Sequence, residues 1–236
     1  PVLLSWPVGG LLAAGAAWII GKTALGLRSD YLAIATLGIS EIVIAVLKNE
    51  DWLARGGKNV IGLPRPVPTA VLLALIWLSE KALNSPWGRM MRAIRDNEVA
   101  AEAMGKDVKA RHLQIFILGS AICGIAGAMM TTLDGQLTPG TYQPLRFTFL
   151  IWVMVIVGGS GNNWGAVLGG FLIWFLWVQV EPLGQWLMAL ITSPMAEGSA
   201  LKAHLMDSVA HMRLLTMGVV LLVVLRFSPR GLIPER

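Results

Sequence analysis

The longest stretch without a charged residue runs from 147 to 180, and it limits the possible folds more than any other feature. One straight helix of that length would reach about 50 Å, whereas the hydrocarbon core of a bilayer is about 30 Å thick. Near its middle the stretch contains Gly158, Gly159 and Gly161, followed by Asn162 and Asn163. We therefore predict two membrane segments that turn at these residues.

Composition supports a membrane protein and excludes other classes. Hydrophobic residues make up 55% of the chain and charged residues only 14%, against about 25% charged in an ordinary soluble domain. The net charge is +5, but the main basic cluster contains acidic residues too, so we do not expect nucleic-acid binding. The single cysteine, Cys123, excludes an internal disulfide and a cysteine-based metal site.

The remaining apolar runs extend the prediction to a bundle. They cover residues 1–21, 31–47, 71–83, 113–133 and 214–225, and the run at 71–83 is short for a membrane span. With the two segments above, the sequence predicts an all-α polytopic transmembrane bundle of about seven segments, forming one domain over 1–236. Residues 181–213 are expected to form a mixed loop between the last two segments.

The distribution of basic residues predicts the orientation. Cytoplasmic loops are enriched in Lys and Arg, so segment 85–111 and the C-terminal Arg226, Arg230 and Arg236 are assigned to the cytoplasmic side. Loop 48–66 then falls outside although it contains Lys48, Arg55, Lys58 and Arg65, which goes against the rule.

Segment 85–111 carries a complete set of helix-boundary signals. Ser85-Pro86 is typical of a helix start, Asn97 can cap a short helix over 98–104, Gly105 can end it, and Asp107 can cap the next helix. Ala100, Ala101 and Ala103 give the short helix a small face that a partner could approach closely. Spacing alone favours a simpler interpretation, a solvated loop with good caps.

The residue pattern of this segment resembles that of the cytoplasmic loop of permease subunits in ABC importers for branched-chain amino acids. Matching pieces are Ser85-Pro86-Trp87-Gly88-Arg89, the run from Arg92 to Ala101, and Met104-Gly105. Others follow in the family's order: residues 29–34, 36–38 and 41–42, residues 124–128, the glycine hairpin 157–161 with 164–165 and 168–169, and residues 229–232. The resemblance covers roughly 28–236.

The resemblance implies a heteromeric importer in the bacterial inner membrane. A second, homologous permease would complete the pathway, two ATPase subunits would bind ATP and Mg, and a periplasmic protein would deliver the substrate. Segment 85–111 would be the loop that couples to the ATPase, through Arg92, Arg95, Asp96, Asn97, Glu98, Ala100, Ala101 and Gly105. The family has further N-terminal spans, so this sequence is expected to lack part of the whole protein.

Several membrane residues are candidates for the pathway or for packing. Glu41, an ionisable residue within an apolar segment, is either functional or an orienting or interfacial residue. Small residues recur every four positions in three series that favour close helix packing: Gly119, Cys123 and Gly127; Ser120, Gly124 and Ala128; Gly161, Gly165 and Gly169. With Gly158 and Gly159, Asn162 could line the pathway or form the turn, and we favour the turn.

Two further features are assigned no chemistry. His204, Asp207 and His211 share a helix face, but an amphipathic helix at the outer interface explains them better than a metal site. The sequence lacks a GxxxxGK[ST] motif, so any ATP would be hydrolysed by another chain, and no cofactor is expected here. The alternatives are an ion- or proton-coupled secondary transporter, an ABC permease for another small solute such as urea or an amide, or a non-transporting membrane scaffold.

Overall fold

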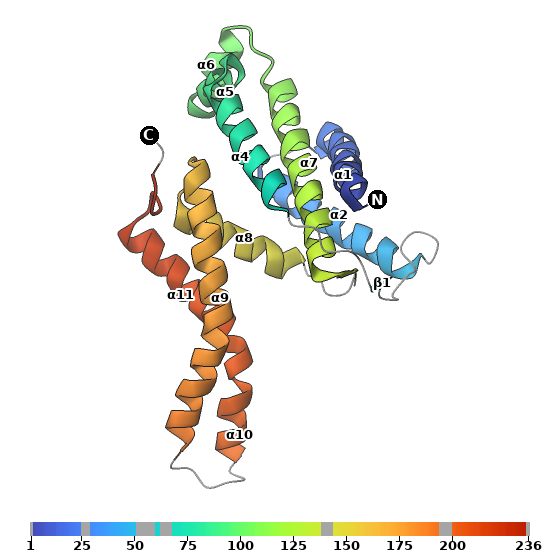
Figure 1. Cartoon of the computed structure of the whole chain (residues 1–236). Helices are drawn as coiled ribbons and strands as arrows, with labels where there is room; N and C mark the ends of the chain where they lie inside the picture. The colour runs from blue at the N-terminus through green and yellow to red at the C-terminus, as the bar shows by residue number, and fades with distance from the viewer. Residues whose placement is uncertain are drawn as a thin grey trace. The chain divides into compact units, whose positions relative to one another are not determined.

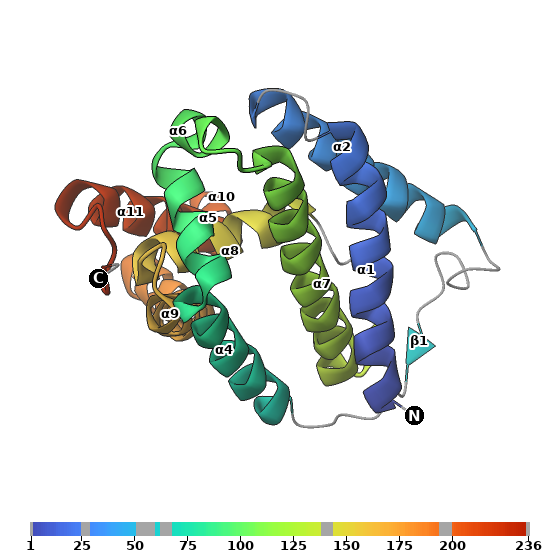
Figure 2. The ribbon, with the colours of Figure 1, turned by 90° about the horizontal axis from the view of Figure 1, so that it is seen from above.

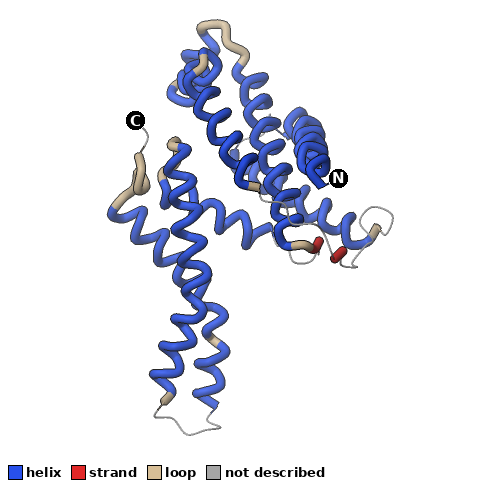
Figure 3. Tube along the Cα trace, in the orientation of Figure 1, coloured by secondary structure: helices blue, strands red, loops and turns tan. Residues whose placement is uncertain are grey.

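The computed structural model describes residues 2–24, 29–50, 60–61, 68–137, 144–193 and 200–234. Helices dominate these residues, with one minimal pair of strands (Figure 3). The chain forms two compact units, Pro1–Pro144 and Leu145–Arg236. The predicted all-α class is confirmed.

The first unit contains six described helices and both strands (Figure 1). In chain order they are α1 (Val2–Ala24), α2 (Ser29–Asn49), β1 (Val60–Ile61), α4 (Thr69–Asn84), α5 (Pro86–Asp96), α6 (Glu98–Ala103), α7 (Val108–Asp134) and β2 (Gln136–Leu137). Helices α1 and α7 lie side by side (Figure 2).

Glycines allow α1 and α7 to approach closely. A Cβ atom on Gly124 would lie 2.5 Å from the Cβ of Ala13 and 2.6 Å from the carbonyl oxygen of Gly9. Gly119 and Gly127, by contrast, have open space where a Cβ would stand. Of the two small-residue series predicted on α7, the structure therefore uses the one that contains Gly124. Both Trp6 and Thr132 are buried, and the Trp6 indole N–H donates to the Thr132 hydroxyl at 3.2 Å.

The strand pair joins loop 48–66, which the sequence assigned to the outer side, to the residues that follow α7. Val60 pairs with Leu137 and Ile61 with Gln136 in antiparallel register. The two strands follow α2 and α7 in the chain, so the segments that leave the C-terminal ends of these helices meet at the same end of the unit. This pairing agrees with the placement of loop 48–66 on the side opposite segment 85–111.

The second unit is built around one long helix. It comprises α8 (Pro144–Gly158, whose first residue belongs to the first unit), α9 (Asn163–Thr192), α10 (Ala200–Asp207) and α11 (Val209–Phe227). Val153 of α8, Ile173 of α9 and Met217 of α11 are each 0% exposed and form the centre of its core. This unit therefore encloses its core with helices that are distant in sequence.

The predicted loop 181–213 is largely wrong. Helix α9 continues through Glu181 and Pro182 to Thr192, and α10 and the first five residues of α11 occupy most of the rest of the described segment. A charge does not end a helix when a partner compensates it, and Glu181 pairs with Arg213 of α11. Likewise, α7 begins at Val108, five residues before the predicted apolar run, because Asp107 caps it there.

Helices occupy all seven predicted membrane segments, but they differ in membrane character. Among the described residues, three helices are long and apolar enough to cross a bilayer: Leu4–Ala24, Val108–Asp134 and Asn163–Thr192. Phe147–Gly158 is a shorter apolar helix. The 16 residues of α4 would extend about 24 Å, short of a 30 Å hydrocarbon core. The structure supports a multi-pass membrane protein without establishing seven spans.

Candidate functional site

Local hydrogen bonds shape the segment from α5 to the start of α7. Ser85, Asn97 and Asp107 each accept a backbone N–H with their side chains, from Gly88 at 3.3 Å, Ala100 at 3.0 Å and Ala110 at 3.0 Å. Gly105 has a φ of 75°, in the left-handed region that commonly ends a helix. The three predicted caps and the predicted glycine stop are confirmed, and α6 ends at Ala103, one residue before the predicted end.

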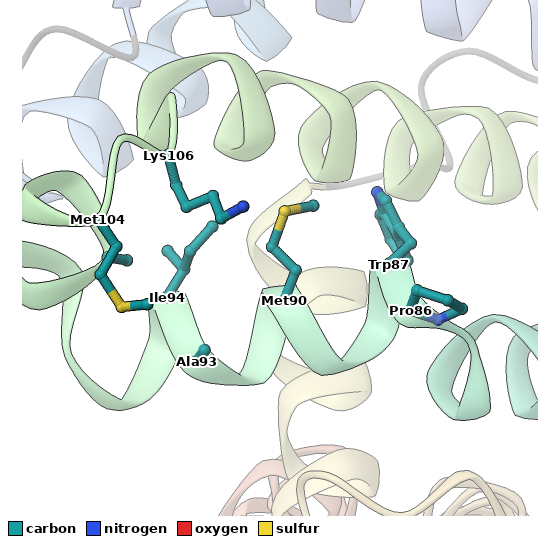
Figure 4. Close-up of a pocket in the computed structure, with 8 residues that line it drawn as sticks. Pro86, Trp87, Met90, Ala93, Ile94, Met104 and Lys106 are labelled. Atoms are coloured by element: carbon teal, nitrogen blue, oxygen red, sulfur yellow. The ribbon is translucent and has the colours of Figure 1, made fainter.

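A small apolar cluster holds these helices together. Ile94 of α5, Ala101 of α6 and Val108 of α7 are buried, and Met90 packs against them. Beside them is a cavity of about 480 Å³ into which Met90 and Ile94 point, with Lys106 along its edge (Figure 4). The remaining lining residues are Pro86, Trp87, Ala93, Ala101 and Met104. The segment has an interior of its own, so it is more than a solvated loop.

Ala101 faces this interior. Its side chain is 7% exposed, whereas Val99 is 76% and Met104 78% exposed. The small face that the sequence suggested for a partner therefore has one member turned inward. An arginine at position 101 would disrupt the cluster, so a substitution there would not report on docking alone.

The other residues assigned to coupling lie on the surface of the segment. Asn97, Glu98, Ala100 and Gly105 are exposed, and Arg92 is half-buried. Arg95 pairs with Asp96 at 3.3 Å, where both side chains are more than half exposed. Such a pair contributes little to stability. The ATPase-coupling role of these residues stays a prediction.

Gly88, which the sequence marked only as part of the family motif, has a structural role of its own. A Cβ atom there would lie 2.4 Å from the carbonyl oxygen of Leu83 and 2.5 Å from that of Ala82. Only glycine lets the first turn of α5 approach the end of α4 this closely. Its position three residues after the helix start Ser85-Pro86 was the signal available in the sequence.

The glycine turn of the second unit is closed by backbone contacts. A Cβ atom on Gly158 would lie 1.9 Å from the carbonyl oxygen of Gly165, and one on Gly169 would lie 2.0 Å from that of Met154. A Cβ on Gly165 would stand 2.7 Å from the Gly158 carbonyl oxygen. These distances are incompatible with a side chain at any of the three positions unless the helices separate, which supports the packing interpretation.

Residues 228–234 complete this turn. Leu232 N–H donates to the carbonyl of Val157, and Ile233 N–H donates to that of Gly158, both at 2.9 Å. These bonds satisfy carbonyl groups that the end of α8 leaves without a helical partner. Gly231 has a φ of 77°, and a Cβ on it would lie 2.3 Å from Cα of Gly159. Two motifs that are distant in the sequence thus form one structure.

Asn162 belongs to this turn. Its side-chain oxygen accepts from the backbone N–H of Trp164 at 2.9 Å and of Gly165 at 3.4 Å, which caps α9. Gly159 and Gly161 have φ values of 116° and 101°, which favour glycine. The turn that we favoured for Asn162 is therefore present, and a pathway role for the residues of this turn stays a prediction.

The other candidates belong to neither of these two regions. Glu41 is exposed on α2, so the structure does not bury its carboxylate in the helix bundle of this chain. No group of three or more potential metal ligands occurs among the described residues, and His204, Asp207 and His211 do not form one. Neither region brings together a nucleophile and a base. What they offer is a surface segment and a rigid helix turn.

Comparisons with known proteins point to one family. A family model described as the permease component of the branched-chain amino acid transport system matches residues 1–225. The probable branched-chain amino acid transport permease protein LivM of Methanocaldococcus jannaschii is 27% identical over 231 residues, covering 89% of this chain and 61% of that protein. The high-affinity branched-chain amino acid transport system permease protein LivM of Escherichia coli is 28% identical over 205 residues, covering 71% and 48%.

A second type of permease also matches, over a shorter part of the chain. The probable branched-chain amino acid transport permease protein LivH of Methanocaldococcus jannaschii is 28% identical over 164 residues, which cover 61% of this chain and 50% of that protein. The chain spans about half to three-fifths of the length of these curated relatives. No solved structure matches the chain.

Proposed function

Because the chain belongs to the branched-chain amino acid transport permease family, we propose that it forms part of the translocation pathway of an ATP-driven importer for these amino acids. The single observation that carries the coupling mechanism is the capped helix α6, which exposes Val99 and is followed by the exposed Met104. A second, LivH-like permease would complete the pathway. Two ATPase subunits would supply ATP hydrolysis, and a periplasmic protein would deliver leucine, isoleucine or valine at the inner membrane.

Helix α6 is suited to transmit a movement rather than to stand alone. It has six residues, and isolated helices shorter than about 12 residues are marginal in water. The Asn97 cap, the Gly105 stop and the Ala101 contact hold it in place from one side. Val99, on its other side, and Met104, directly after its last residue, are large apolar side chains in contact with water, which favours a docking partner.

The connection from α6 to the membrane is short. Asp107 begins α7 four residues after α6 ends, and α7 then runs 27 residues through one of the long apolar helices. A push on α6 therefore reaches the packed α1–α7 pair through a capped turn and a continuous helix. The Val108 contact with Ile94 and Ala101 ties the same movement to α5. In this mechanism, the ATPase state tilts or shifts α7 and thereby changes access to the pathway.

The test is reconstitution of the whole complex with its companion subunits in liposomes. We expect uptake of labelled leucine that requires ATP on the ATPase side and the periplasmic protein on the other. Uptake driven by an ion or proton gradient without ATP would instead identify a secondary transporter. Uptake of urea or an amide in place of leucine would change the substrate class.

Val99→Asp tests coupling without touching the interior of the segment. A buried interface would have to accommodate an unpaired carboxylate, so we expect leucine uptake to fall at least about tenfold, with the complex still assembled. Val99→Thr, which has nearly the same shape and no charge, is the matched control and should retain most uptake. Equal uptake by both variants and the parent would overturn the role of α6.

A further inference from the structure

The outer end of the second unit contains a mixed-charge site that the coupling mechanism does not use. Glu181 of α9 and Arg213 of α11 form an ion pair that joins the two helices. Glu181 lies 18 positions after Asn163, which corresponds to about 27 Å along the helix. This distance is close to the thickness of the hydrocarbon core. If the glycine turn is on the cytoplasmic side, as the basic C-terminal residues predict, the pair lies at the opposite face of the membrane, where substrate would arrive.

Arg213 has capacity beyond the pair. Its guanidinium group lies 5.4 Å from the centre of the Trp177 ring, and its side chain is 29% exposed. Within the described structure, its Nε atom is buried and has no hydrogen-bond partner. A guanidinium group carries five N–H donors, and an unsatisfied buried donor costs free energy. An additional acceptor near this group would remove that cost.

A cavity of about 630 Å³ adjoins the carboxylate of the pair. Glu181 and Asp207 supply negative charge, Gln185 supplies an amide, and the remaining lining residues are largely apolar: Pro182, Trp186, Ala189 and Val209. Small-molecule sites commonly have volumes of about 300–1,000 Å³ and combine an apolar wall with a few polar groups. This cavity has both properties.

We propose that this cavity is a receiving site for the zwitterionic head group of an amino acid, a proposal that rests on the function proposed above. The ligand's ammonium group binds between Glu181 and Asp207, and its carboxylate binds the guanidinium group of Arg213. The aliphatic side chain lies against Trp186 and Val209. Arg213 contacts Glu181 but does not itself line the cavity. To admit the ligand, the direct pair between Glu181 and Arg213 therefore opens, the guanidinium group turns toward the cavity, and one ion pair is exchanged for two.

Charge balance explains why a zwitterion fits better than an ion. Glu181 and Arg213 cancel each other when the site is empty, and Asp207 is exposed to solvent, so the empty site can persist at the edge of the membrane. A zwitterion adds one charge of each sign and keeps both residues compensated. An anion without an ammonium group leaves Glu181 and Asp207 unpaired, and an amine without a carboxylate leaves Arg213 unpaired. Uncompensated charges in a partly desolvated site are costly.

Ligand binding can be measured on the purified transporter complex in detergent. Labelled leucine is the probe, competed by 4-methylpentanoate, which lacks the ammonium group, and by 3-methylbutylamine, which lacks the carboxylate. We expect each half-ligand to compete at least about tenfold more weakly than leucine. Glu181→Gln should lower the affinity for leucine about tenfold, and 4-methylpentanoate should then compete as well as leucine. Arg213→Gln should also lower the affinity for leucine about tenfold, and 3-methylbutylamine should then compete as well as leucine.

Two further variants separate ligand recognition from helix pairing. Asp207→Asn lies outside the ion pair and should weaken leucine about threefold without loss of assembly. The charge exchange Glu181→Arg with Arg213→Glu restores a pair between α9 and α11 but reverses the site. We expect it to restore thermal stability and not leucine affinity. Glu80→Gln, on α4 of the other unit, is the matched carboxylate control.

The outcomes are distinguishable from those of the proposed function. ATP-driven leucine uptake by the parent complex, measured in the same preparation, supports the importer independently of the site. With such uptake present, absence of leucine binding by the purified complex overturns the receiving site. Unchanged leucine affinity in Glu181→Gln, Arg213→Gln and Asp207→Asn also overturns it. Full recovery of leucine affinity in the charge-exchange variant overturns it too, because the pair would then have a structural role only.

Discussion

The α5–α6 segment and the α8–α9 turn both bring the chain through a sharp change of direction, but they are held by different contacts. In the first, side chains of Ser85, Asn97 and Asp107 cap the helices around a small apolar cluster. In the second, glycine backbones meet directly, and residues 228–234 add further backbone hydrogen bonds.

This difference separates a surface that can engage a partner from a rigid joint. Side-chain caps hold α6 while leaving Val99 and Met104 exposed. Backbone-to-backbone contact around Gly158 and Gly165 leaves no space for a side chain, and both residues are buried. Substitutions at the exposed positions and caps of the first region should therefore have local effects, whereas substitutions of the buried glycines in the second should separate helices.

The largest effect is expected for Gly169→Ala. The new Cβ would lie 2.0 Å from the carbonyl oxygen of Met154, so α8 and α9 must move apart. We expect the free energy of unfolding to fall by about 3 kcal/mol, which lowers the midpoint of thermal unfolding in detergent by roughly 6–12 °C. Gly170→Ala is the matched control, because nothing lies within 4 Å of its Cβ position. Equal midpoints for the two variants would contradict the tight crossing.

A pair of left-handed glycines compares the two regions directly. Gly105 and Gly231 have φ values of 75° and 77°, but only Gly231 has backbone atoms where a Cβ would stand. Gly105→Ala should cost about 1 kcal/mol from backbone strain alone, and Gly231→Ala about 2–3 kcal/mol because the clash with Gly159 is added. Hydrogen exchange across 98–106 and 228–234 measures both. A larger loss of protection for Gly105→Ala would reverse the comparison.

The smallest effect is expected for the caps. Asn97→Ala removes the acceptor for the Ala100 N–H and should cost about 1 kcal/mol, seen as roughly fivefold faster amide exchange in α6. Asn97→Ser, which keeps a hydroxyl acceptor, should restore most of the protection. Asn162→Ala should alter the first turn of α9 less, because Gly165 is also held by its packing against Gly158. Equal exchange in the two helices would show that backbone packing adds nothing to a cap.

The sequence by itself determined the features that depend on neighbours a few positions away. The helical membrane class follows from the long apolar runs, and the caps at Ser85, Asn97 and Asp107 act on N–H groups three residues further along the chain. The left-handed stop at Gly105 is equally local. These contacts need no distant partner, which is why the start of α5 and both ends of α6 could be predicted to within a residue.

Only the tertiary structure decided which of several equivalent surfaces is used. Gly124 and Gly127 have the same chemistry, yet α1 packs against the first. Ala101 is buried while Ala100 is exposed, and Gly231 lies against Gly159, 72 positions away. Helix α9 passes Glu181 because Arg213, on another helix, compensates the charge. Which of several similar residues is packed depends on the helix that lies against it, and the position of that helix is a property of the folded chain.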